Sequence, residues 1–268
     1  MSHLQVENGR GIYYESYQGS NPAVVLIHGW GMHTRIWDPT IAALRGAGYA
    51  VVSFDQRGCG RSDKDFAMVS IDAAVSDVVQ LVESLSLSSV VLHGWSLGAA
   101  IAVGAAARLG TRCKGVISVG GATPRLVQGE GWPYGMAPGA ATALCHSLAT
   151  ERATSLAGFM SVMFAVQVDT ATSHWAAQTL LESAQSADAA LLDLEKLDQR
   201  AILAELAVPF LAILGCRDVL VQPELVRQAA TIPRNGTVVE FEHSGHAPFI
   251  EEREKYAKTL LNFLALLR

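Results

Sequence analysis

The sequence predicts an α/β protein with a mostly parallel, doubly wound sheet and a helical segment inserted late in the chain. Short apolar runs alternate with amphipathic helical patterns over the first 120 residues, which is typical of parallel strands joined by right-handed crossovers. The alternation stops after Gly121 and resumes at Val208. Of the 268 residues, 50% are hydrophobic and 17% are charged, so the chain can bury the core of one large domain.

The first half of the chain contains most of the predicted sheet. Two apolar segments, Leu4–Val6 and Ile12–Tyr17, flank an Asn-Gly pair, which is a strong signal for a β-hairpin. The continuous apolar run Ala23–Gly29 is typical of a strand buried on both faces. The other elements expected here are the strands Ala50–Asp55, Val90–Gly94 and Gly115–Gly120 and the helices Thr34–Ala47, Ser70–Leu85 and Leu97–Leu109.

The insertion is recognised by its composition. Residues 123–200 are rich in Ala, Leu, Ser and Met and contain no strand-like run. We therefore assign residues 1–122 and 201–268 to the core and residues 123–200 to a helical lid. The core is expected to resume with the strands Val208–Leu214 and Thr237–Phe241 and the helices Pro223–Ala230 and Glu251–Leu267.

Ser96 lies in the motif GWSLG, where the strand that ends at Gly94 meets the helix that begins at Leu97. A sharp strand-to-helix turn would expose its hydroxyl at the carboxyl edge of the sheet. Gly94 and Gly98, which have no Cβ, leave room for such a turn. A G-x-S-x-G match with an idle serine is the alternative, but the strand–turn–helix context favours a nucleophile.

A serine hydroxyl is a weak nucleophile near neutral pH and needs a base. His246 is the best placed, because it follows the last predicted strand and therefore lies at the same edge of the sheet. His243 gives the alternative of an H-x-x-H metal pair, although no other ligand cluster supports it. His28 and His93 lie in or beside predicted strands, and we interpret them as structural.

The base needs a carboxylate to orient it. Asp218 follows the strand FLAIL at the same edge, and the chain order Ser96, Asp218, His246 matches the order of nucleophile, acid and base in G-x-S-x-G hydrolases. Capping of the following helix is the alternative role for Asp218. Asp55, at the end of another strand, is interpreted as an organiser of its turn.

Acyl transfer also needs N–H donors for a developing oxyanion. The Leu97 amide, directly after the serine, is one candidate. The Trp30 amide, in the turn HGWG after the first buried strand, is the other. The Trp30 ring could serve only in packing, and the two roles are compatible.

Composition excludes several classes of partner. The net charge is −5 and no Lys/Arg-rich block occurs, which disfavours nucleic acid and membrane surfaces. No apolar run is long enough to cross a membrane, and the first residues do not resemble a signal peptide. Neither a P-loop nor a dinucleotide fingerprint is present. No metal or organic cofactor is expected, because serine-based acyl transfer needs none. The four cysteines lack C-x-x-C spacing, which is typical of reduced thiols in a cytoplasmic protein.

Together these motifs resemble the α/β-hydrolase superfamily over essentially the whole chain. The segments HGWGM, GWSLG, PFLAILGCRD and GHAPFI are similar to a narrower group, the pimeloyl-acyl-carrier-protein methyl ester carboxylesterases of biotin synthesis. The resemblance implies an α/β-hydrolase fold and a serine carboxylesterase that hydrolyses methyl or short-chain esters through an acyl-enzyme. It implies a catalytic triad of Ser96, Asp218 and His246. It also implies substrate contacts from Trp30, Leu97 and His246 and, in the lid, from Phe159, Met160, Ser161, Val162 and Met163.

The charge of the lid departs from that family, whose basic lid residues engage an acidic acyl carrier protein. Residues 123–200 contain four Lys or Arg against eight Asp or Glu, a balance of −4. Like charges across a contact oppose association, so an acyl carrier protein is disfavoured as a partner and a small free ester is expected. The apolar lid residues Phe159, Met160, Met163, Phe164, Trp132 and Trp175 indicate an apolar site, or simply pack the lid onto the core.

The same three catalytic groups could serve other reactions. A thioesterase or lactonase, a perhydrolase and a carbon–carbon bond hydrolase are alternatives within the enzyme class. A low-turnover ligand-binding receptor that keeps the triad is an alternative from a different class. Enzymes of this fold that use aspartate as the nucleophile are disfavoured by Ser96.

Overall fold

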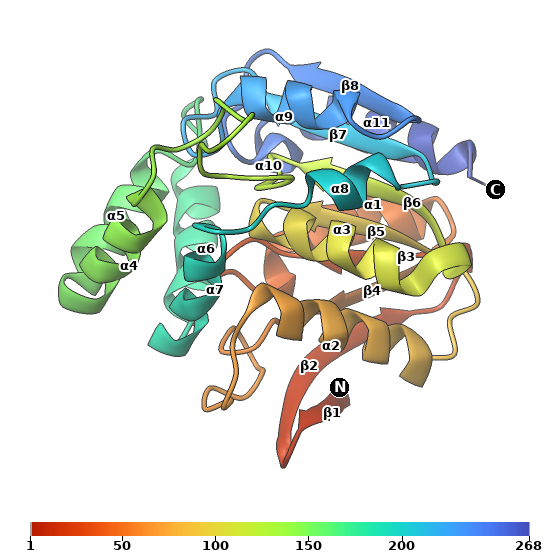
Figure 1. Cartoon of the computed structure of the whole chain (residues 1–268). Helices are drawn as coiled ribbons and strands as arrows, with labels where there is room; N and C mark the ends of the chain where they lie inside the picture. Colours follow the sequence, from red (N-terminus) through yellow and green to blue (C-terminus); the bar gives the residue numbers. More distant parts are fainter. Residues whose placement is uncertain (1, 268) are drawn as a thin grey trace.

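The computed structural model describes residues 2–267, so the outermost positions of the predicted core, residues 1 and 268, lie outside it. Eight strands form one sheet in the order β1-β2-β4-β3-β5-β6-β7-β8 (Figure 1). β2 pairs antiparallel with both β1 and β4, and the other neighbours are parallel. The predicted sheet is thus confirmed. Its strands are β1 (Ser2–Glu7), β2 (Arg10–Tyr17), β3 (Ser20–Ile27), β4 (Tyr49–Phe54), β5 (Val90–Trp95), β6 (Cys113–Val119), β7 (Phe210–Gly215) and β8 (Gly236–Phe241).

Helices cover both faces of the sheet, as expected for a doubly wound fold. In Figure 1, α2, α3 and α9 lie in front of the sheet and α1 and α11 lie behind it. Within residues 2–267, no helix is both long enough and apolar enough to span a membrane. The core helices are α1 (Asp38–Gly46), α2 (Ile71–Ser84), α3 (Leu97–Leu109), α8 (Arg200–Ala204), α9 (Pro223–Thr231), α10 (Pro248–Glu251) and α11 (Arg253–Ala265).

Two expected helices are each divided into two pieces. The helix expected over Thr34–Ala47 begins as a 3₁₀ turn at Thr34–Trp37, and α1 starts only at Asp38, with Pro39 in its first turn. The helix expected over Glu251–Leu267 starts at the last residue of α10, is interrupted at Glu252 and continues as α11 to Ala265. Glu252 separates them, because its backbone leaves the helical region with φ −126° and ψ 57°.

The sheet has its topological switch point between β3 and β5. The chain goes from β3 to β4 on one side and then returns to β5 on the other side of β3. In open α/β sheets, ligands bind in the crevice at the carboxyl ends of strands that meet in this way. β5 and β7 are buried along their whole length, so these carboxyl ends emerge from a rigid core.

The insertion between β6 and β7 contains four helices and no strand within residues 123–200. They are α4 (Ala140–Thr150), α5 (Arg152–Ser161), α6 (Thr170–Leu181) and α7 (Ala189–Asp193), with a 3₁₀ turn at Gln185–Asp188. In Figure 1 they lie together at one end of the sheet. The predicted boundary at residues 200 and 201 falls in the first turn of α8.

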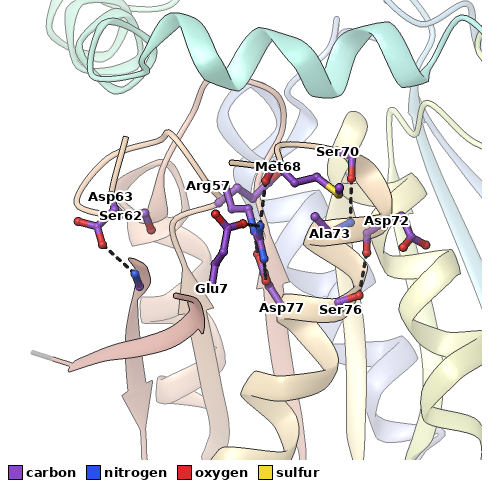
Figure 2. Close-up of polar contacts among 12 residues, drawn as sticks. Glu7, Arg57, Ser62, Asp63, Met68, Ser70, Asp72, Ala73, Ser76 and Asp77 are labelled. Carbon is purple, nitrogen blue, oxygen red and sulfur yellow. Dashed lines mark hydrogen bonds and ion pairs between the residues drawn. The ribbon is translucent and has the colours of Figure 1, made fainter. Parts of the chain in front are cut away.

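A buried ion pair joins the loop after β4 to α2. Arg57 donates two hydrogen bonds of 2.7 Å to the Asp77 carboxylate, and both side chains are at most 6% exposed. Arg57 also donates to Glu7 at 2.7 Å and to the Met68 carbonyl at 2.8 Å (Figure 2). The guanidinium therefore ties β1, the loop after β4 and α2 together beside the site described below.

We expect Asp77→Ala to lower the free energy of unfolding by about 3 kcal/mol, because it leaves a buried guanidinium without its bidentate partner. Urea denaturation measures the change. Asp72→Ala is the matched control on the same helix. Its ion pair with Arg108 is exposed, so its loss should be below about 1 kcal/mol. Equal losses in the two variants would contradict the argument.

Candidate active site

Ser96 occupies a strained turn between β5 and α3. Its φ of 56° and ψ of −122° lie in a backbone region that residues other than glycine rarely adopt. A Cβ on Gly94 would lie 2.2 Å from the Gly98 carbonyl oxygen, and a Cβ on Gly98 would lie 2.3 Å from that of Ile27 in β3. The predicted tight turn is confirmed, and both glycines are required by close backbone approach.

His246 and Asp218 form a buried pair at the ends of β8 and β7. Their Nδ1 and Oδ2 atoms are 2.7 Å apart, and the two side chains are 1% and 2% exposed. Since a carboxylate only accepts hydrogen bonds, the neutral ring carries its proton on Nδ1 and leaves the Nε2 lone pair available. The other Asp218 oxygen accepts from the Leu220 and Val221 amides at 2.8 and 3.0 Å. Asp218 therefore caps its own turn, whereas α9 begins later, after Gln222.

The His246–Asp218 pair is in close contact with three other parts of the chain. The Trp95 indole donates to the His246 carbonyl at 2.7 Å, and the His246 amide donates to the Met163 carbonyl at 2.9 Å. Gly120, with φ 48°, directly follows β6 and lies against the His246–Asp218 pair. A Cβ on Gly120 would lie 3.1 Å from His246 Nδ1. The sequence analysis missed Gly120, although a glycine directly after a buried strand is a signal of close approach.

Ser96 and His246 line the same pocket. No hydrogen bond joins the hydroxyl to the imidazole among the residues that the structure describes. Such bonds are often long in a ligand-free enzyme and shorten when substrate binds. The fold thus brings alcohol, imidazole and carboxylate from three separate parts of the chain to one edge of the sheet.

The two candidate oxyanion donors border the same pocket. Leu97 is the first residue of α3, so its amide has no partner within the helix. Within residues 2–267, neither the Leu97 nor the Trp30 amide donates to a protein acceptor. A Cβ on Gly29 would lie 3.3 Å from Ser96 Cβ, so the turn that carries Trp30 lies directly against the serine.

The pocket has a volume of about 590 Å³ and a mostly apolar lining. Of the lid residues expected to contact substrate, Phe159 and Val162 line it, whereas Met160, Ser161 and Met163 do not. Ser161 is exposed, and Met163 is completely buried. Phe164, Trp132 and Trp175 also lie outside the lining. The lining residues that the sequence analysis missed include Leu126, Met136, Leu144, Leu191, Leu220 and Val221.

His28, His93 and Asp55 have the structural positions expected of them. His28 is buried and accepts from the Gln56 amide, while His93 is buried against the Tyr256 hydroxyl. Burial lowers the pKa of His93 to about 4, so this ring is neutral near pH 7. Asp55 accepts from the Thr34 and Arg61 amides and organises its turn.

The alternative interpretation of His243 and His246 as a metal-binding pair has no support in the structure. His243 is exposed, whereas His246 is buried. Across residues 2–267, no cluster of three or more His, Cys, Asp or Glu side chains could hold a metal ion.

Residues 24–259 match the model of the Alpha/beta hydrolase family. The chain belongs to this family. A pimeloyl-[acyl-carrier protein] methyl ester esterase from Stenotrophomonas maltophilia is 31% identical over 93% of this hydrolase and 95% of its own length. Among solved structures, an esterase from Exiguobacterium antarcticum superposes with a TM-score of 0.94 at 27% identity and covers 98% of this chain and 99% of its own. A bromoperoxidase from Bacillus anthracis superposes with a TM-score of 0.92 at 26% identity, with the same coverage. The two esterases among these relatives support an ester hydrolase.

One carboxylate of this α/β hydrolase connects the His246 loop to the insertion. Glu251 accepts hydrogen bonds from the Gly245 and Ala247 amides at 2.8 and 3.3 Å. Its other oxygen accepts from the amides of Ala165 and Val166, just after α5, at 2.7 and 3.3 Å. Four backbone amides thus share one acceptor group, which holds the loop and the insertion in a fixed relation.

We expect Glu251→Ala to lower the free energy of unfolding by about 1–3 kcal/mol, because partly buried amides lose their acceptor. Thermal and urea denaturation measure the effect. Glu254→Ala, which removes an exposed carboxylate on α11, is the control and should change stability by less than about 0.5 kcal/mol. If Glu251→Ala proved as harmless as the control, the Glu251 contacts would have no stabilising role.

Proposed function

We propose that this α/β hydrolase is a serine carboxylesterase that hydrolyses methyl or short-chain esters of apolar acids through an acyl-enzyme. The observation that carries the proposal is the buried His246–Asp218 pair, which borders one apolar pocket together with the strained Ser96. In this proposal residues 123–200 are a lid over that pocket. The similarity to a methyl ester esterase and to an esterase of known structure supports ester chemistry.

The proposed reaction has two acyl transfers. His246 Nε2 takes the Ser96 proton while Ser96 Oγ attacks the ester carbonyl, and Asp218 holds the imidazole in position. The Trp30 and Leu97 amides stabilise the tetrahedral oxyanion. The protonated His246 then gives its proton to the departing alcohol, and water activated by the same imidazole hydrolyses the acyl-enzyme. This chemistry requires neither a metal nor an organic cofactor.

We propose a small free ester, rather than a carrier-bound one, as the substrate. Three of the four lid bases are already paired with lid acids: Arg152 with Asp188, and Arg125 and Arg200 with Asp198. Among the described lid residues, only Lys196 remains as an exposed cation without an ion pair. A surface of this kind offers little attraction to an acidic carrier protein. The reduced cysteines fit a cytoplasmic location.

A perhydrolase is the second candidate, favoured by the similarity to a bromoperoxidase. Hydrogen peroxide would then replace water in the second step, so that the acyl-enzyme yields a peracid and free serine. Peracid formation from acetate and peroxide, measured by the oxidation of bromide, separates this activity from simple hydrolysis.

We expect Ser96→Ala to reduce kcat for p-nitrophenyl esters at least ~10⁴-fold, because the acyl acceptor is lost. A fluorophosphonate should label the unmodified enzyme at Ser96, as located by peptide mass spectrometry, and should not label the variant. Circular dichroism serves as the check on folding. Near-normal turnover in the variant would exclude Ser96 as the nucleophile. A single burst without sustained turnover by the unmodified enzyme would favour a receptor.

We expect kcat/KM for a pimeloyl-acyl-carrier-protein methyl ester to rise as ionic strength increases to about 0.15 M, because salt screens repulsion between two acidic surfaces. An uncharged ester such as methyl octanoate is the control and should show little change. A decrease with salt on the carrier-bound ester would reveal an attractive interface, and the preference for free esters would then be wrong.

A further inference from the structure

The pocket beside Ser96 continues between α4 and α5. We propose that this continuation is an open groove for a neutral hydrocarbon chain of the ester, and that Gly158 keeps its outer end clear. The inference rests on the proposed esterase function and adds the class of substrate to it.

The groove is formed by one face of each helix. The lining positions recur at spacings of three and four residues, which places them in a single stripe along each helix. α4 and α5 pack side by side at the end of the molecule (Figure 1). At the helical rise per residue, the stripe covers about 10 Å on α4 and about 6 Å on α5, the scale of a medium-length acyl chain. The stripes comprise Ala140, Ala141, Leu144 and Ser147 on α4 and Ser155, Gly158 and Phe159 on α5.

The lining changes from buried to exposed along its length. At the inner end, His246 and Leu97 are each 1% exposed. At the outer end, Ser147 and Gly158 are exposed, and Val162 is 41% exposed. The groove therefore leads from the reacting groups to the surface, so that a long chain can pass out between the helices.

The chemistry of the lining selects a neutral chain. Of the described lining residues, only His246 is ionisable, and the lid contributes just two hydroxyls, those of Ser147 and Ser155. A charged group in the groove would lose hydration without gaining an opposite charge. A hydrocarbon chain would instead bury its surface against alanine, leucine and phenylalanine side chains.

Gly158 has no packing reason to be glycine. It lies within α5 without a positive φ, and an added Cβ would meet no atom within 4 Å. Glycine also weakens a helix interior relative to alanine. The space beside Gly158 belongs to the groove, and a large side chain there would fill it.

The test compares two substitutions on α5, Gly158→Phe in the groove and Ala157→Phe on the exposed helix surface outside the lining. The probes are two methyl ketones, 2-decanone and 2-butanone, which resemble methyl esters but are not hydrolysed. Isothermal titration calorimetry gives their affinities. Gly158→Phe should raise Kd for 2-decanone at least about tenfold and change that for 2-butanone by less than about twofold. Ala157→Phe should change neither.

The inference is overturned if Gly158→Phe leaves the affinity for 2-decanone unchanged, or if it weakens both ketones equally. Gly158→Leu, a smaller obstruction, should give an intermediate effect and replaces the phenylalanine variant if that protein does not fold. Failure of the proposed function is a separate result, because it would appear as undiminished ester hydrolysis by Ser96→Ala, whereas ketone binding does not depend on turnover.

Discussion

The close approach of α3 to the end of β3 is the constraint on which the site depends. Gly98 brings the first turn of α3 so near the Ile27 carbonyl that no Cβ fits between them. The chain can reverse from β5 into α3 over so short a distance only if Ser96 accepts a positive φ. That conformation is unfavourable by about 1–3 kcal/mol and persists because the packed sheet on either side fixes both ends of the turn. The position of the Ser96 hydroxyl and the free Leu97 amide are both consequences of this one turn.

The other half of the site is held jointly by the core and the insertion. The His246 loop is fixed by the Trp95 indole and by the Met163 carbonyl and the Glu251 carboxylate. Glu251 also accepts from the amides of Ala165 and Val166 after α5. The loop that carries His246 and the segment after α5 are thus linked through one carboxylate.

Charge is distributed unevenly between the pocket and the surface above it. The insertion carries a balance of −4, yet most of its ionised groups are engaged in local ion pairs or helix capping. The pocket lining, in contrast, is apolar apart from the reacting groups and two serines. Under the proposed function, specificity for the chain of the ester depends on shape and desolvation, and surface charge acts mainly on the approach of large charged partners.

The sequence by itself predicted the α/β class, the Asn-Gly hairpin, the tight turn at Ser96 and the positions of Asp218 and His246 at the ends of strands. These features depend on local signals: apolar runs, glycine spacing and the rule that parallel strands end at one edge. It could not predict that Gly120 lies against the His246–Asp218 pair or that Glu251 binds amides 86 residues away. It also placed Met160, Ser161 and Met163 beside substrate, while the structure lines the pocket with the α4 face. Only tertiary packing decides such positions, because the rotation of a helix about its axis depends on what it packs against, which a weakly amphipathic segment does not specify.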